Sequence, residues 1–267
     1  MDLQLQGKRA LVTGGSRGIG KAVARALAAE GCDVALLARH AAALAATAQE
    51  IATATGRKVV FVGADTTNDD AVRSAFADAA AQLGGSIDIL VNAAAEPAGF
   101  ANPPQLADIT GEFFHAEMNT KVMGYLRCAR EVAPGMRNAG WGRIVNVSGL
   151  AARQTGNAVG SMRNIAVAAL TKNLADELGP HGIQVNLVHP GLTRTERTAA
   201  LVAARAAAQG LPEAAVYEQM AAGNSIRHLV DAGEVADVVA FLCSPRSRAI
   251  NGESIAVGGG APRSIYY

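Results

Sequence analysis

The stretch Thr13-Gly14-Gly15-Ser16-Arg17-Gly18-Ile19-Gly20 follows an apolar run and opens an Ala-rich segment that ends before Gly31. Its order is strand, glycine turn and helix. The glycines at 14, 18 and 20 allow a sharp turn and a close approach of backbone to phosphate, and free amides at a helix N-terminus attract an anion. The stretch therefore predicts a dinucleotide-binding turn. Its contacts are expected from Gly14, Ser16, Arg17, Gly18, Ile19 and Gly20.

Short apolar runs alternate with segments of helical length along all 267 residues. This alternation builds a parallel sheet with helices on both faces, because each crossover between parallel strands is right-handed. We predict a single α/β domain over 1–267, a Rossmann-type doubly wound parallel sheet of about seven strands flanked by helices. The expected strands are Arg9–Thr13, Asp33–Leu37, Lys58–Val62, Asp88–Asn92, Arg143–Val147, Gln184–His189 and Ser254–Val257.

The segment 195–228 interrupts the alternation with additional helix-rich sequence. It follows the strand expected at Gln184–His189, and ligands of such sheets bind at the carboxyl ends of the strands. We therefore expect this segment to form a lid over a substrate. The alternative is an ordinary surface insertion.

Composition favours a small-molecule ligand in the cytoplasm. The net charge is +1 with scattered basic residues, which gives no reason to expect a nucleic-acid or membrane partner. The first six residues lack the apolar core of a signal peptide, and no apolar run reaches membrane-spanning length. Cys32, Cys128 and Cys243 are far apart and lack metal-ligand spacing, so we expect buried free thiols and no metal site.

The residue types on the second strand bear on cofactor choice. A carboxylate about 20 residues after the glycine turn would bind the ribose hydroxyls of NAD(H). Ala38-Arg39 stands there instead. Arg39 and Arg17 could flank a 2′-phosphate through charge-assisted hydrogen bonds, so NADP(H) is favoured over NAD(H).

Further motifs follow in order along the chain. The turn Thr13-Gly-x-x-x-Gly-x-Gly, the run Leu90-Val91-Asn92-Ala93-Ala94-Ala95 and the helix end Leu170–Leu178 resemble motifs of the short-chain dehydrogenase/reductase family. The resemblance covers nearly the whole chain. It implies hydride transfer between a nicotinamide and a small carbonyl or alcohol substrate. Further cofactor contacts implied by the resemblance are Asp65, Thr66, Asn92, Ala93, Pro190, Gly191, Thr193 and Thr195.

The positions that carry catalysis in this family differ here. Family members use a Tyr, a Lys four residues later, an upstream Ser and an Asn on an earlier helix. Matching the motifs without gaps places Gly160 at the Tyr position, Asn164 at the Lys position and Lys121 at the Asn position. Gly149 stands at the usual Ser position, and Ser148 precedes it.

Lys and Asn are thus exchanged between two positions that face each other in the family fold. We expect Lys121 to replace the missing cation and proton donor, with Asn164 or Arg163 orienting an oxygen. Ser148 would serve if the backbone were shifted by one residue. The alternative is that Lys121 is a solvated helix residue in a decayed site.

Three functions remain open from the sequence. The first is an NADP(H)-dependent oxidoreductase with an atypical proton donor. The second is a cofactor-binding sensor or scaffold without turnover. The third is a non-redox lyase or isomerase that uses Lys121.

Two long helices are expected at about 111–139 and 161–178. The resemblance implies that they pair across a two-fold interface, so we expect a homodimer or homotetramer.

Overall fold

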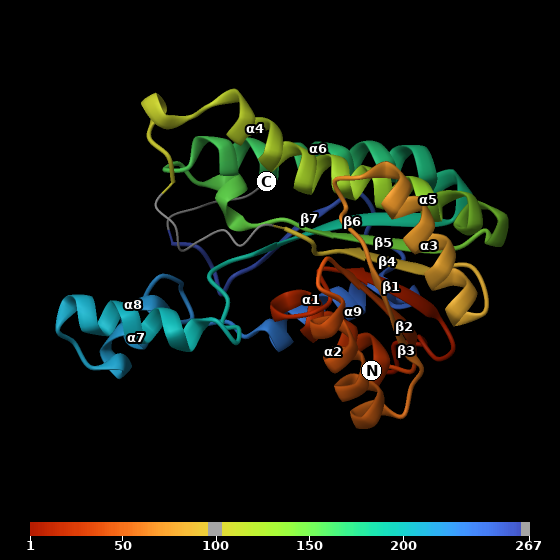
Figure 1. Cartoon of the computed structure of the whole chain (residues 1–267), viewed down its shortest axis with the longest axis horizontal. Coiled ribbons are helices and arrows are strands. Elements are labelled where there is room, and N and C mark those ends of the chain that lie inside the picture. Colours follow the sequence, from red (N-terminus) through yellow and green to blue (C-terminus); the bar gives the residue numbers. More distant parts are fainter. Residues whose placement is uncertain (96–102, 263–267) are drawn as a thin grey trace.

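The predicted strands form one parallel sheet in the order β3-β2-β1-β4-β5-β6-β7 (Figure 1). The computed structural model describes residues 1–95 and 103–262. All seven expected strands are confirmed, each to within one residue at either end. Their bounds are β1 Arg9–Thr13, β2 Asp33–Ala38, β3 Val59–Gly63, β4 Ile89–Asn92, β5 Gly142–Val147, β6 Ile183–Pro190 and β7 Ser254–Val257.

Helices cover both faces of the sheet (Figure 1). Helices α1, α2 and α9 pack on one face, and α3, α5 and α6 pack on the other. Figure 1 also shows α7 and α8 beside each other, away from the sheet. The bounds are α1 Gly18–Ala29, α2 Ala41–Thr55, α3 Asp69–Leu83, α4 Gly111–Met118, α5 Gly124–Ala139, α6 Ala158–Leu178, α7 Thr198–Gln209, α8 Glu213–Ala221 and α9 Ala232–Cys243.

The apolar runs have both faces buried, which explains why they are continuous rather than alternating. Neighbouring residues on one strand enter opposite halves of the core. Val12 and Leu36 contact the half beneath α1 and α9, whereas Leu11 and Leu37 contact the half beneath α3 and α5. The sheet therefore separates two apolar layers, one on each of its faces.

The strand order reverses between β1 and β4, and this is where a crevice is expected in a doubly wound sheet. Thr13, the last residue of β1, closes the floor of that crevice. Its Oγ1 accepts the amides of Ala93 at 3.0 Å and Ala94 at 3.1 Å. The end of β4 is thereby fixed next to the glycine turn.

The two ends of the segment 195–228 lie next to each other at the carboxyl edge of the sheet. Arg194 donates its amide to Val230 O at 2.7 Å and accepts from the Ala232 amide at 3.1 Å. Val202, on α7, and Val216, on α8, belong to a small apolar core of the segment's own. The expected helix-rich insertion is therefore present as a pair of helices with a closed base.

No helix in residues 1–95 and 103–262 is long and apolar enough to cross a membrane. The three cysteines are buried and unpaired, as expected.

The glycine turn supplies a test of the fold. A Cβ built at Gly20 would overlap the carbonyl oxygen of Gly14, whereas a Cβ at Gly63, on β3, meets nothing within 4 Å. Gly20→Ala should therefore lower the free energy of unfolding by about 1–3 kcal/mol through overpacking. Urea unfolding monitored by circular dichroism measures this. Gly63→Ala is the matched control, and equal effects of the two substitutions would contradict the assigned turn geometry.

Candidate active site

A cleft of about 940 Å³ is lined by the glycine turn, the strand ends and the start of segment 195–228. It brings together all four residues predicted for catalysis, Lys121, Ser148, Arg163 and Asn164. All but one of the residues predicted for cofactor binding also line it. These are Gly14, Ser16, Arg17, Gly18, Ile19, Gly20, Arg39, Asp65, Thr66, Ala93, Pro190, Gly191, Thr193 and Thr195.

Asn92, predicted as a cofactor contact, is the exception and does not line the cleft. Its side chain is 1% exposed and donates to Asn146 Oδ1 on β5 at 2.9 Å. Asn146 in turn donates to Thr171 Oγ1 at 2.9 Å, on α6. The side chain therefore crosses between strands below the cleft, because its position on β4 directs it into the core.

The glycine turn is closed by a residue that the sequence analysis missed. Gly18 donates its amide to Glu196 Oε2 at 3.0 Å, across 178 residues of sequence. Gly18 has φ of +57° and Gly14 has φ of +68°, backbone conformations that glycine adopts at little cost. Nothing in the sequence pattern links Glu196 to the turn, since both approach only in the folded chain.

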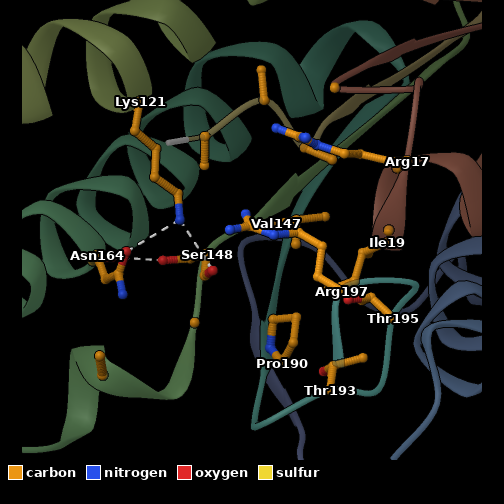
Figure 2. A pocket seen from close by; sticks show the side chains of 18 of the residues that line it. Arg17, Ile19, Lys121, Val147, Ser148, Asn164, Pro190, Thr193, Thr195 and Arg197 are labelled. Carbon is orange, nitrogen blue, oxygen red and sulfur yellow. Dashed lines mark hydrogen bonds between the residues drawn. The ribbon is translucent and has the colours of Figure 1, made fainter. Parts of the chain in front are cut away.

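Two basic side chains stand at the cofactor end of the cleft. Arg17 precedes α1, and Figure 2 shows its side chain extending into the cleft. Arg39 follows β2. The Thr67 amide lowers the pKa of Asp65 by hydrogen bonding, and the nearby charge of Arg39 lowers it further. Arg39 and Asp65 therefore lie close enough to interact at this end.

Lys121 is the central polar group of the other end. It lies in the π-helical turn η2 (Asn119–Met123) that joins α4 to α5, and it is 3% exposed. Its Nζ donates to Ser148 O at 3.0 Å and to Asn164 Oδ1 at 3.2 Å (Figure 2). The alternative of a solvated Lys121 is therefore wrong.

Burial, together with the neighbouring charge of Arg163 and against the opposing charge of Glu117, lowers the pKa of Lys121 to about 7. The amine can consequently exist in both protonation states near neutral pH. A group with such a pKa is suited to proton transfer.

Arg163 reaches the same oxygen as Lys121. Its Nε donates to Asn164 Oδ1 at 3.4 Å, and its Nη1 forms an ion pair with Glu117 on α4. Arg163 is 5% exposed, so this pairing offsets the burial of its charge. Glu117 was missed by the sequence analysis. The available signal is its position one helical turn before Lys121, on the same face.

Ser148 and Gly149 form the wall opposite Lys121. The Ser148 hydroxyl donates to Asn164 O at 3.3 Å, while its carbonyl accepts from Lys121. Gly149 donates its amide to His189 Nδ1 at 3.3 Å. Burial lowers the pKa of His189 to about 4, so this strand-end histidine stays neutral and accepts that bond.

The space beside Gly160 is filled by Asn157. A Cβ at Gly160 would overlap the Asn157 side chain, whose Oδ1 accepts the Gly160 amide at 2.8 Å and caps α6. No tyrosine among the described residues lines the cleft: Tyr125 is buried and donates to Val147 O, and Tyr217 lies on α8.

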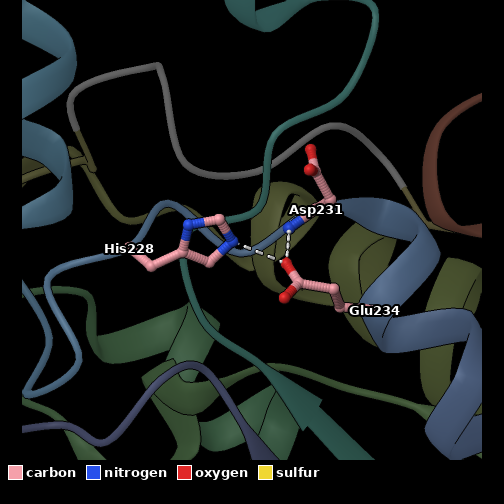
Figure 3. A group of neighbouring side chains, drawn as sticks. All are labelled: His228, Asp231 and Glu234. Carbon is pink, nitrogen blue, oxygen red and sulfur yellow. Dashed lines mark hydrogen bonds and ion pairs between the residues drawn. The ribbon is translucent and has the colours of Figure 1, made fainter.

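His228, Asp231 and Glu234 cluster at the base of segment 195–228, as Figure 3 shows. Glu234 Oε2 accepts the Asp231 amide at 2.7 Å as part of a capping box and contacts His228 Nε2 at 2.9 Å. Asp231 pairs with Arg194. The partial positive charge of the α9 N-terminus and this guanidinium both disfavour a cation, so we assign the cluster to closing the base.

Comparisons with known proteins identify the family to which the chain belongs. A family model described as enoyl-(acyl carrier protein) reductase matches residues 14–262. The short-chain reductase protein NovJ of Streptomyces niveus is 35% identical over 95% of this chain and 93% of its own. The 3-oxoacyl-[acyl-carrier-protein] reductase FabG of Vibrio cholerae is 33% identical over 97% of this chain and 98% of its own.

Among solved structures, L-sorbose reductase from Gluconobacter frateurii, complexed with NADPH and L-sorbose, superimposes with a TM-score of 0.91. It is 27% identical, and the match covers 99% of this chain and 100% of that one. Family model, relatives and structure all span nearly the full length. The chain belongs to the short-chain dehydrogenase/reductase family.

Proposed function

We propose that this protein is an NADP(H)-dependent oxidoreductase that acts on a small carbonyl or alcohol, with Lys121 as its proton donor and acceptor. The observation that carries this proposal is the position of the Lys121 Nζ in the cleft. An ammonium has three N–H donors, and Ser148 O and Asn164 Oδ1 accept two of them. The third is left for a substrate oxygen.

NADP(H) fits the residues of the other end. The glycine turn would supply backbone amides for the pyrophosphate, with Glu196 giving up the Gly18 amide that it accepts in this structure. Arg17 and Arg39 supply the cations that a 2′-phosphate requires. Asp65 and Thr66 line the adenine side, and Pro190–Thr195 borders the nicotinamide side. When bound, the cofactor supplies or accepts a hydride. L-sorbose reductase, complexed with NADPH, is a relative in which this cofactor is present.

The chain's own groups account for the proton. A carbonyl oxygen that gains negative charge needs donors in place, and the buried Lys121 ammonium is such a donor. Asn164 holds the amine through its Oδ1, and burial, with the charge of Arg163, lowers the pKa of the ammonium. Ser148 positions the amine through its carbonyl rather than its hydroxyl.

Segment 195–228 is proposed to cover the substrate. Arg197, Met220 and Asn224 come from this segment and line the cleft. Because the base at Arg194 is closed by backbone hydrogen bonds, α7 and α8 can tilt as a unit about it.

The protein is further proposed to form a homodimer or homotetramer through α5 and α6. Large apolar side chains are exposed here without a partner in the described chain, and such a patch favours self-association. These side chains are Met123, Met162 and Ile165.

Cofactor choice is tested by calorimetric titration with NADPH and NADH. The wild-type protein should bind NADPH at least tenfold more tightly than NADH. Arg39→Gln should weaken NADPH binding about tenfold and leave NADH binding unchanged, because only NADPH carries the 2′-phosphate. Arg25→Gln, on α1 outside the cleft lining, is the control. Equal affinities for both cofactors in the wild type would refute the assignment.

Turnover is tested with NADPH and a panel of ketones and aldehydes. Lys121→Met should lower kcat/KM about 10²–10⁴-fold, the range for loss of a general acid. The rate of carbonyl reduction should fall as pH rises through about 7, because only protonated Lys121 donates. In Lys121→Arg this pH dependence should vanish.

Lys172→Met, which removes an exposed amine paired with Asp176, is the matched control. NADPH binding without oxidation of NADPH by any panel member would support the sensor alternative. An adduct of Lys121 trapped by borohydride in the presence of the same carbonyls would instead support the lyase alternative.

Self-assembly is tested by sedimentation velocity over a range of protein concentrations. The wild type should sediment as a dimer or tetramer. Ile165→Asp should shift it toward the monomer, because a carboxylate would be desolvated in the interface. Leu211→Asp, an exposed position beyond α7, is the control. A wild-type monomer at all concentrations would disprove the interface.

A further inference from the structure

The acidic side chains that line the cleft are unevenly divided between its two ends. Among the described residues, only Asp65 and Glu196 contribute carboxylates to the lining. Asp65 lies at the cofactor end, and Glu196 is bonded to the Gly18 amide. Within residues 1–95 and 103–262, the end that holds Lys121 is therefore lined by cations without a carboxylate.

Arg197 is the cation in this set that the proposed function does not use. It lies directly before α7, is exposed and lines the cleft. Figure 2 shows its side chain extending from the side of Thr195 toward Val147 and Ser148. Its head group thus approaches the part of the cleft where Lys121 lies.

The other cations are already engaged or belong to the cofactor end. Arg163 forms an ion pair with Glu117, and Arg194 forms one with Asp231 outside the cleft. Within residues 1–95 and 103–262, by contrast, the Arg197 guanidinium has no ion-pair or hydrogen-bond partner. An arginine in a cleft is a fitting partner for a planar anion, because its fork binds both oxygens of a carboxylate.

We propose that the substrate carries an anionic group, a carboxylate, which Arg197 binds while the carbonyl of the same molecule faces Lys121. The substrate class is then an oxo acid and its hydroxy acid. This proposal rests on the proposed function. Because Arg197 belongs to segment 195–228, binding of the carboxylate also draws that segment over the cleft.

The anion that Arg197 binds could instead be the pyrophosphate of the cofactor. The experiment separates a substrate carboxylate from this pyrophosphate. Wild-type protein is first titrated with NADP⁺ by calorimetry. Pyruvate and levulinate are then titrated by saturation-transfer NMR, with and without saturating NADP⁺, beside their methyl esters. NADP⁺ permits no reduction, so binding is measured without turnover.

At least one of the two acids should bind tenfold or more tightly than its ester. Arg197→Met should remove this difference while keeping the affinity for NADP⁺ within twofold of wild type. Arg205→Met, on α7 outside the lining, should behave as wild type. Raising the salt concentration should weaken binding of the acid but not of the ester.

Equal binding of acids and esters, or binding of neither, would overturn the proposal. A tenfold loss of NADP⁺ affinity in Arg197→Met would also overturn it and assign Arg197 to the pyrophosphate. Failure of the wild type to bind NADP⁺ contradicts the proposed function instead. In that case the titrations without cofactor still decide whether Arg197 recognises a carboxylate.

Discussion

The buried ammonium of Lys121 constrains everything around it. A lowering of its pKa from 10.5 to about 7 corresponds to a penalty on the charged form on the order of 5 kcal/mol. The fold tolerates this because two oxygens accept from the Nζ, one from the end of β5 and one from α6. The π-helical turn before α5 presents the side chain inward at this point. Such turns in helices often occur at functional sites.

The sheet topology decides which groups meet this amine. β4 and β5 are neighbours beyond the reversal of strand order, and α6 begins beside the end of β5. A helix-borne cation, a strand-end carbonyl and a helix-borne amide therefore converge at one carboxyl edge. The glycine turn after β1 lies along the same edge, held to β4 by Thr13. The glycine turn and Lys121 thus line the same cleft.

Sequence reasoning was strongest where local pattern decides structure. Buried parallel strands are continuous apolar runs, so the sequence predicts all seven strands. The family resemblance predicts that Lys121 faces Asn164, and their side chains are hydrogen-bonded in the structure. Sequence reasoning failed where the partner of a side chain lies far away in the sequence. Glu196 is an ordinary surface acid by pattern, and only packing brings it to Gly18. Glu117 stands one helical turn before Lys121, but its pairing with Arg163 forms only in the folded chain. For Asn92 the pattern located the strand end, but only packing shows that its side chain turns to Asn146 below the cleft.

The Asn157 side chain fills the space beside Gly160, and this bears on whether the cleft is a decayed active site. An unused cleft has no reason to keep a buried lysine and arginine, since replacing buried charge with apolar residues is often neutral or stabilising. Here both charges are buried and both have partners, and the Asn157 side chain occupies the volume that a Cβ at position 160 would need. A tyrosine introduced at 160 would displace the cap of α6 and with it the helix turn that carries Arg163 and Asn164. Lys121, Arg163 and Asn164 therefore form a mutually hydrogen-bonded buried cluster, beside a position 160 whose side-chain space Asn157 already occupies.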